Sequence, residues 1–254
     1  MTIDSSAAPG DVLASPDLPT RRELRLAESA ESKGKSRNGF LNLLKETGII
    51  VGSALIVSWL IKTFLVQAFY IPSESMEATL DVGDRVLVSR LVPRFRQVSR
   101  GDIVVFRDPG DWLGAYTVPE RGLVTRALTL VGLLPQDSGE HLIKRAIGVP
   151  GDHVACCDAA GLVSINGEPI MEALYLAPGV SPSVSSFDVV VPDGTLFVMG
   201  DNRPNSADSR YNSEKPYGGF VPIDNVVGTA FATIWPFNHL GLLRNPSSVF
   251  ELVP

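Results

Sequence analysis

The pattern of hydrophobic and polar positions divides the chain into three parts. Residues 1–40 are rich in Ser, Ala and Pro, carry charges of both signs and show no apolar period, which is typical of a disordered segment. Only the stretch TRRELRLAESAES within it favours a short helix. Residues 47–70 are mostly apolar, and Lys62 is the only charged residue among them. About 20 apolar residues are enough to cross a bilayer as a helix, so this stretch predicts a membrane span.

After the apolar stretch, short runs of β-branched and aromatic residues alternate with turn signals such as PGD, NG and PDG. These runs predict strands within residues 84–92, 101–108, 141–149, 162–170, 186–192, 194–202 and 225–237. Asn166-Gly167 predicts a two-residue hairpin turn. Residues 108–140 interrupt the strand pattern and predict an inserted loop with a short amphipathic helix. No second span is expected, because the apolar run near the C-terminus is short and contains a proline.

We therefore expect three regions: a disordered cytoplasmic tail (1–44), a transmembrane helix (45–68) and a β-rich catalytic domain (69–254) with an insertion at 108–140. Basic residues flank both ends of the span, so their number alone does not set its orientation. The disordered tail has no reason to cross the membrane, whereas a folded domain can be translocated whatever its charge. This places the N-terminus in the cytoplasm and the domain outside.

Composition narrows the chemistry. The chain has 254 residues and a formal net charge of −6, which argues against nucleic acid as a partner, because a phosphate-binding surface needs clustered Lys and Arg. The only cysteines, Cys156 and Cys157, are adjacent, which excludes a disulfide framework and a cysteine zinc site. Two buried thiols are the favoured interpretation, and a disulfide between neighbours is the alternative. No metal or organic cofactor is expected, since no ligand cluster or phosphate-binding glycine loop occurs.

Two serines stand one residue apart in YIPSESMEATL, just after the apolar stretch. A serine hydroxyl needs a base to become a nucleophile, and none of the three histidines stands in a motif with an obvious acid partner. The other suitable base is a lysine whose ordinary pKa of about 10.4 is lowered by burial. Beyond the span only Lys144 and Lys215 remain. Lys215 lies in the polar loop NSEKPYGG, whereas Lys144 lies in the strand-like HLIKRAIGV.

These segments resemble the bacterial type I signal peptidases (leader peptidases), which are membrane-anchored serine proteases with a Ser-Lys dyad. The similar stretches, in order, are IPSESMEATLDVGDRVLV, GDIVVF, IKRAIGVPGD, GDNRPNSADSR and VVGTAFATIWPFNHLG. Each motif alone is weak, but all of them in this order behind one apolar span are very specific. The resemblance implies a mainly β fold: an extracytoplasmic domain of coiled antiparallel β-sheets, anchored by one N-terminal transmembrane helix in the cell membrane.

The resemblance also implies roles for single residues. Ser75 matches the nucleophile, Lys144 the general base, and Ser73 the serine whose hydroxyl helps to stabilise the oxyanion. Ser206 matches the serine that orients the lysine. The implied supporting ion pairs are formed by Asp201, Arg145, Asp208 and Arg210, and the implied substrate-binding residues are Ile71 and Met76. Pro204 departs from the acidic residue that is common at its position.

The implied substrates are signal peptides of exported preproteins, cleaved after small residues of the A-x-A type. The substrate is expected to bind as an extended strand. The implied surroundings are the lipid bilayer, which Phe69 and Trp112 are expected to touch, and the protein export channel. Two other functions stay open: a non-enzymatic, membrane-tethered domain that binds peptides, and a self-cleaving regulator of related fold. Such regulators are soluble, so the predicted span argues against the second.

Overall fold

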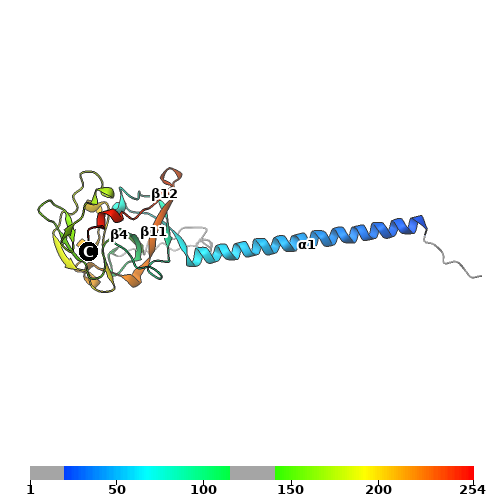
Figure 1. Cartoon of the computed structure of the whole chain (residues 1–254), viewed down its shortest axis with the longest axis horizontal. Coiled ribbons are helices and arrows are strands. Elements are labelled where there is room, and N and C mark those ends of the chain that lie inside the picture. The colour runs from blue at the N-terminus through cyan, green and yellow to red at the C-terminus, as the bar shows by residue number, and fades with distance from the viewer. Residues whose placement is uncertain (1–19, 115–140) are drawn as a thin grey trace, which may run out of the picture. The chain divides into compact units, whose positions relative to one another are not determined.

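The computed structural model describes residues 20–114 and 141–254. These residues belong to two compact units that divide between Ile56 and Val57 (Figure 1). The first unit is the larger part of one helix, and the second holds the end of that helix and all the strands.

Helix α1 (Arg21–Phe64) begins where the sequence predicts a short helix, but it continues without a break into the apolar segment. Thr20 and Glu23 cap its start, because the Thr20 N–H donates to the Glu23 carboxylate at 2.8 Å and the Glu23 N–H donates to the Thr20 hydroxyl at 3.4 Å. The short helix expected in this part is therefore present, but it continues through residues that were expected to be disordered. The rest of the predicted tail, residues 1–19, lies outside the described residues.

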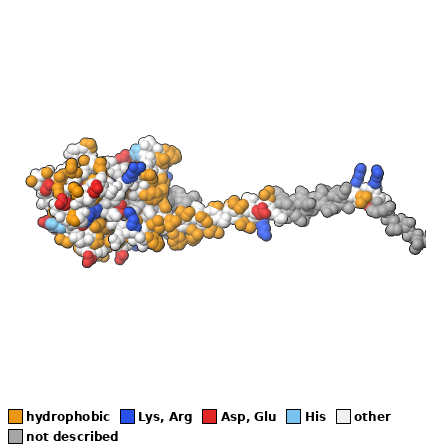
Figure 2. All heavy atoms as spheres, in the orientation of Figure 1, with side chains coloured by type: hydrophobic (Ala, Val, Ile, Leu, Met, Phe, Trp, Pro, Cys, Tyr) orange, Lys and Arg blue, Asp and Glu red, His pale blue; other side chains and the backbone are white. Residues whose placement is uncertain are grey.

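Within α1, the segment Asn42–Ile61 has a mean hydropathy of 1.6 and is long and apolar enough to cross a membrane. Hydrophobic side chains cover much of this part of the helix (Figure 2). The predicted span of 45–68 is wrong at its end, since α1 stops at Phe64 and Val66–Tyr70 form strand β1. The apolar run continues into a β-strand, and hydrophobicity alone does not distinguish the two structures.

The second unit is built on two antiparallel sheets. The larger has the order β1-β2-β11-β3-β4-β9-β10, with β12 paired to β11, and the smaller has the order β7-β6-β5-β8. The larger sheet consists of β1 (Val66–Tyr70), β2 (Arg85–Ser89), β3 (Ile103–Arg107), β4 (His141–Gly148), β9 (Thr195–Met199), β10 (Val221–Pro222), β11 (Val226–Trp235) and β12 (Gly241–Leu242). The smaller consists of β5 (His153–Cys156), β6 (Val163–Ile165), β7 (Glu168–Pro169) and β8 (Phe187–Val190).

The mainly β, antiparallel class predicted from the sequence is confirmed, and each predicted run contains a strand. The hairpin turn is present too: Ile165 pairs with Glu168, and Asn166 and Gly167 both have positive φ. Strand β5 was not predicted. Of the predicted insertion, the structure describes residues 108–114, and residues 115–140 lie outside the described part.

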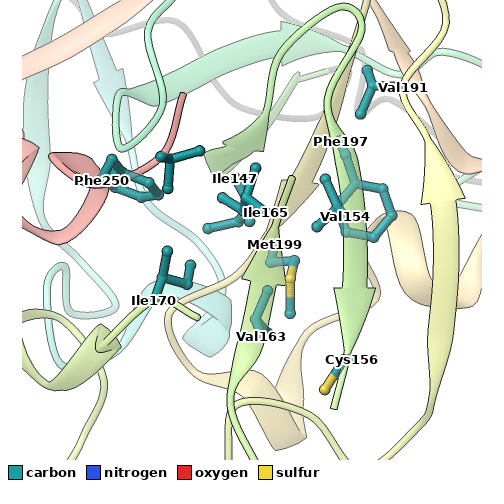
Figure 3. Close-up of a cluster of buried hydrophobic side chains, with 11 residues drawn as sticks. Ile147, Val154, Cys156, Val163, Ile165, Ile170, Val191, Phe197, Met199 and Phe250 are labelled. Carbon is teal, nitrogen blue, oxygen red and sulfur yellow. The ribbon is translucent and has the colours of Figure 1, made fainter. Parts of the chain in front are cut away.

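Three groups of buried apolar side chains form the core. One joins the smaller sheet to β4 and β9, with Ile147, Val154, Phe197 and Met199 at its centre (Figure 3). A second lies beneath the segment that follows β1 and includes Phe69, Ile71 and Met76. The third contains Phe106, Trp112 and Ala146. Strand β4 contributes to all three groups, so its side chains are held from several sides.

The two cysteines are bonded to each other, so the expected pair of buried thiols is wrong. Cys156 and Cys157 form a disulfide between adjacent residues. Cys156 is the last residue of β5 and is buried, whereas Cys157 is exposed. The peptide bond between the two cysteines is cis, and strand β5 ends at Cys156.

Strand β11 approaches β2 so closely that it requires glycine at position 228. A Cβ atom there would lie 2.1 Å from the Ser89 carbonyl oxygen and 2.8 Å from Val88 Cγ1. We predict that Gly228→Ala lowers the free energy of unfolding by about 1–3 kcal/mol, since a packed core relieves added volume only by shifting backbone. Chemical denaturation measures the change. Gly241→Ala on β12 is the control, because its nearest contact is 3.9 Å away; equal effects of both variants would contradict the explanation.

Candidate active site

Strand β4 carries two charged residues in succession at its centre, Lys144 and Arg145. It pairs with β3 through Val104 and Lys144, and with β9 through Met199 and Arg145. Neighbouring strand residues point to opposite faces, so the two cations reach different surroundings. Both are nevertheless buried, with 4% of Lys144 and 2% of Arg145 exposed.

Ser75 lies in a short 3-10 helix, η1 (Glu74–Met76), that follows strand β1. The chain enters this turn at Ser73 with extended backbone, as expected after Pro72, which fixes its own φ and donates no hydrogen bond. The Asn202 N–H donates to the Ser75 carbonyl at 3.1 Å, and the Asn202 side chain donates to the Glu74 carbonyl at 3.0 Å. The segment after β9 therefore fixes the backbone of Ser75.

This arrangement brings Ser75 and Lys144 together, although 69 positions separate them in the chain. Lys144 Nζ lies 2.5 Å from Ser75 Oγ, and Ser73 Oγ lies 3.4 Å from the same oxygen. Ser75 is 6% exposed. Among the described residues, no histidine forms a hydrogen bond with Ser75, and Lys215 is exposed beside Asp111. Of the two lysines weighed from the sequence, Lys144 is the one at the serine.

Burial lowers the pKa of Lys144 from the ordinary 10.5 to about 8. The carboxylates of Asp208 and Asp201 act in the opposite direction, because they favour the charged ammonium, and the Arg210 guanidinium adds to the lowering. The loss of hydration exceeds the attraction of the two carboxylates. A substantial fraction of the amine is therefore neutral near physiological pH.

Each of the two carboxylates is paired with an arginine through two parallel contacts. Arg145 Nε and Nη2 lie 2.8 and 2.5 Å from the Asp201 oxygens, and the Thr79 hydroxyl donates to the same carboxylate at 2.6 Å. Arg210 Nε and Nη2 both lie 2.8 Å from the Asp208 oxygens. The ion pairs expected among these four residues are thus present, and their fork geometry satisfies both oxygens of each acid.

Ser206 reaches the site without forming the expected hydrogen bond to the lysine. Its hydroxyl is buried and has no hydrogen-bond partner among the described residues. A Cβ at Gly200 would lie 2.3 Å from Ser206 Oγ and 2.4 Å from the Ser75 carbonyl oxygen. The absence of a side chain at Gly200 therefore lets Ser206 and the backbone of Ser75 approach each other.

A cavity of about 470 Å³ opens beside the two serines and Lys144. Its apolar lining includes Val82, Trp112, Leu113 and Leu142. The expectation that Ile71 and Met76 line the substrate pocket is not met, because both side chains are fully buried in the core beneath Ser75.

The expected contact of Phe69 and Trp112 with lipid is also not met. Phe69 is 2% and Trp112 7% exposed, because both pack into the core.

A buried ion pair next to the site was not predicted. Arg203 and Glu172 contact each other through two pairs of atoms, and each side chain is 1% exposed. The Tyr175 hydroxyl donates to Glu172 at 2.6 Å, and the Arg145 guanidinium lies 4.3 Å from the centre of the Tyr175 ring. Arg203 stood inside a recognised motif, GDNRPNSADSR, but nothing in the sequence around Glu172 indicated a partner.

The described residues contain no group of three His, Cys, Asp or Glu side chains that could hold a metal ion. The polar groups that line the cavity include the hydroxyls of Ser73 and Ser75 and the partly neutral amine of Lys144. A buried serine next to a neutral amine fits nucleophilic attack on a carbonyl carbon.

Comparison with known proteins gives a consistent result. The family model described as signal peptidase, peptidase S26, matches residues 44–235. A signal peptidase I of Mycobacterium tuberculosis is 36% identical over 94% of this chain and 86% of its own length. One of Pseudomonas fluorescens is 35% identical over 82% of this chain and 78% of its own length. A solved signal peptidase I of Enterococcus faecalis aligns over 53% of this chain and 97% of its own, with 26% identity and a TM-score of 0.33.

Because the amine of Lys144 is neutral more readily in the folded protein than in the unfolded chain, stability depends on pH. The unfolded state binds the extra proton between pH 8 and 10.5, so stability rises with pH across that window. Lys144→Met removes the titrating amine, so its stability does not depend on this group. We predict that the free energy of unfolding of Lys144→Met, relative to that of wild type, falls by about 3 kcal/mol from pH 7 to pH 10.5, since each pKa unit corresponds to about 1.4 kcal/mol. Denaturation at several pH values measures this, with Lys215→Met at an exposed position as control. A constant difference between Lys144→Met and wild type would contradict the lowered pKa.

Proposed function

Since this chain belongs to the signal peptidase family, peptidase S26, and is a serine peptidase, we propose that it removes signal peptides from exported preproteins with Ser75 as nucleophile and Lys144 as general base. The observation that carries the proposal is the 2.5 Å contact between Lys144 Nζ and Ser75 Oγ in a buried site. The lowered pKa of the lysine supports the assignment of the base.

In the proposed mechanism, neutral Lys144 accepts the proton of Ser75 as the oxygen attacks the scissile carbonyl. The negative charge that forms on the carbonyl oxygen is stabilised by the Ser73 hydroxyl and the Ser75 backbone N–H. Lys144 then passes the proton to the leaving amine, which leaves an acyl-enzyme on Ser75. Water attacks this ester with Lys144 again as base, and the released signal peptide carries the new carboxylate.

The surrounding residues act on the base without touching the substrate. Arg145 and Arg210 pair with Asp201 and Asp208 and so offset part of the negative charge that favours the ammonium form of Lys144. We assign Ser206, which is buried near the backbone of Ser75, the role of orienting the lysine through its hydroxyl. These residues therefore position the reacting groups.

The cavity suits a substrate with small side chains near the cleaved bond. A volume of about 470 Å³ with apolar lining admits an extended peptide whose alternate side chains enter pockets. Bulky Trp112 and Leu142 limit those pockets, which favours cleavage after A-x-A. Asn42–Ile61 would anchor the enzyme in the membrane, with the N-terminus in the cytoplasm and the β domain outside, beside the export channel. Ser75 follows Ile61 by 14 residues, so cleavage takes place close to the bilayer surface.

We predict that Ser75→Ala and Lys144→Met each lower the cleavage rate of a preprotein by at least 1,000-fold, because either change removes the nucleophile or its base. The assay uses the full chain in detergent, with product separated by electrophoresis. Lys215→Met serves as the matched lysine control and is expected to cleave at the wild-type rate. Wild-type cleavage rates in both test variants would contradict the assignment of Ser75 and Lys144. A wild-type chain that does not cleave the preprotein would favour the alternative of a domain that binds peptides without cleaving them.

A second prediction concerns pH. Lys144 must be neutral to act as base, so kcat/KM should fall about tenfold per pH unit below a midpoint near 8 and level off above it. A peptide without ionisable side chains keeps the titration that of the enzyme. A rate that is independent of pH between 6 and 9 would show that the amine is not the base.

A further inference from the structure

The cavity beside Ser75 has two kinds of lining, which come from different elements. Its apolar side chains belong to the turn before β2, the segment after β3 and strand β4: Val82, Trp112, Leu113 and Leu142. Two short 3-10 helices add polar side chains, Glu74 from η1 and Asn205 from η4 (Arg203–Asn205). Neither Glu74 nor Asn205 takes part in the proposed mechanism.

The Glu74 carboxylate is exposed but is held at the cavity by an amide. Asn205 Nδ2 donates to Glu74 Oε2 at 2.7 Å, and Asn202 Nδ2 donates to the Glu74 carbonyl at 3.0 Å. Among the described residues, no Lys, Arg or His side chain forms an ion pair with Glu74. Its hydrogen-bond partner is therefore neutral, and its negative charge is not offset by an adjacent cation.

Glu74 and Lys144 are the acidic and basic side chains that line the cavity within the described part of the chain. The lysine acts as the proposed base in its neutral form. The charges that shift its pKa are those of Asp208, Asp201 and Arg210, so Glu74 has little effect on the base. In the reactive form, the charge that this lining presents to a bound peptide is therefore that of Glu74.

A single carboxylate in a peptide-binding cavity discriminates between charged side chains of the substrate. It attracts a lysine or arginine and repels an aspartate or glutamate, so the difference in binding includes both effects. Glu74 is exposed, and water and salt weaken such interactions to at most about 1 kcal/mol for each pair. The expected effect is a preference between substrates, not an absolute requirement.

The two kinds of lining indicate which part of the substrate meets Glu74. In the proposed function, the small residues of the A-x-A pattern precede the cleaved bond and occupy the apolar part of the cavity. The residues after the bond belong to the mature protein and are not limited to small apolar side chains. The polar part formed by Glu74 and Asn205 is therefore available to them.

We propose that Glu74 is a specificity-determining residue that favours a basic over an acidic side chain at the first or second position after the cleaved bond. This inference rests on the proposed function, because it requires cleavage at Ser75. It concerns the choice among substrates and leaves the roles of Ser75 and Lys144 unchanged.

The test compares preproteins that differ at one position. Lys, Gln or Glu is placed at the first or at the second residue after the cleaved bond, and in a parallel set at the middle residue of A-x-A. The full chain in neutral detergent cleaves the substrates in competition, and mass spectrometry gives the ratios of kcat/KM. The enzymes are wild type, Glu74→Gln and Glu74→Lys. Glu77→Gln is the matched control, since Glu77 follows in the same turn but does not line the cavity.

Wild type should cleave the Lys substrate about fivefold faster than the Glu substrate at low ionic strength, with Gln between them. Glu74→Gln should bring this ratio to about one, and Glu74→Lys should invert it. Glu77→Gln should keep the wild-type ratio. Raising the salt concentration from about 20 mM to about 500 mM should reduce the preference of wild type, because screening weakens an exposed charge. A loss of structure would not produce an inverted ratio.

Equal cleavage of the Lys and Glu substrates by wild type, or an unchanged ratio in Glu74→Gln, would overturn the inference. The same loss of preference in Glu77→Gln would overturn the assignment to Glu74. A preference that depends on Glu74 only at the middle residue of A-x-A would overturn its placement after the cleaved bond. In each of these cases wild type still cleaves the Gln substrate; a wild-type chain that cleaves no substrate would instead count against the proposed function.

Discussion

The active site depends on a single constraint, the burial of an amine that must lose its proton. Lys144 is 4% exposed, and the loss of hydration lowers its pKa to about 8. The same burial would be unfavourable for any ammonium, so the fold has to hold the side chain in place. It does so by placing Lys144 on β4, inside the larger sheet. Lys144 pairs with β3, and the next residue, Arg145, pairs with β9. The rigidity of β4 and the basicity of its lysine are therefore linked.

Two carboxylates within range of Lys144 could have undone this effect. Asp201 and Asp208 each accept paired hydrogen bonds from an arginine. The Thr79 hydroxyl also donates to Asp201, and the Gly200 N–H donates to Asp208. Buried ion pairs of this kind add little net stability, since desolvation offsets their attraction. Their effect here is electrostatic, because they neutralise the acids without removing them and leave desolvation as the main influence on the lysine.

Local patterns predicted much of this structure because they depend on neighbouring residues. The β-branched residues in HLIKRAIGV and the turn residues Asn166 and Gly167 specify a strand and a hairpin directly. The end of α1 was predicted wrongly, because the apolar run continues from the helix into β1. Ser75 and Lys144 were assigned by resemblance to known motifs, not by local pattern. The Glu172–Arg203 pair could not be predicted, since it is a tertiary contact and nothing in the sequence around Glu172 marks that residue as the partner of Arg203.

The Glu172–Arg203 pair has a consequence for how this region can diverge. Both side chains are buried, and each is the other's counterion, so replacing either one alone leaves an isolated charge in a medium of low polarity. The Tyr175 hydroxyl and the stacked Arg145 guanidinium connect the pair to the segment that holds the lysine. A sequence that keeps a stable fold must therefore replace both partners nearly at the same time, because the effect of each substitution on stability depends on the other residue. Drift should be slow here even at positions that never touch a peptide.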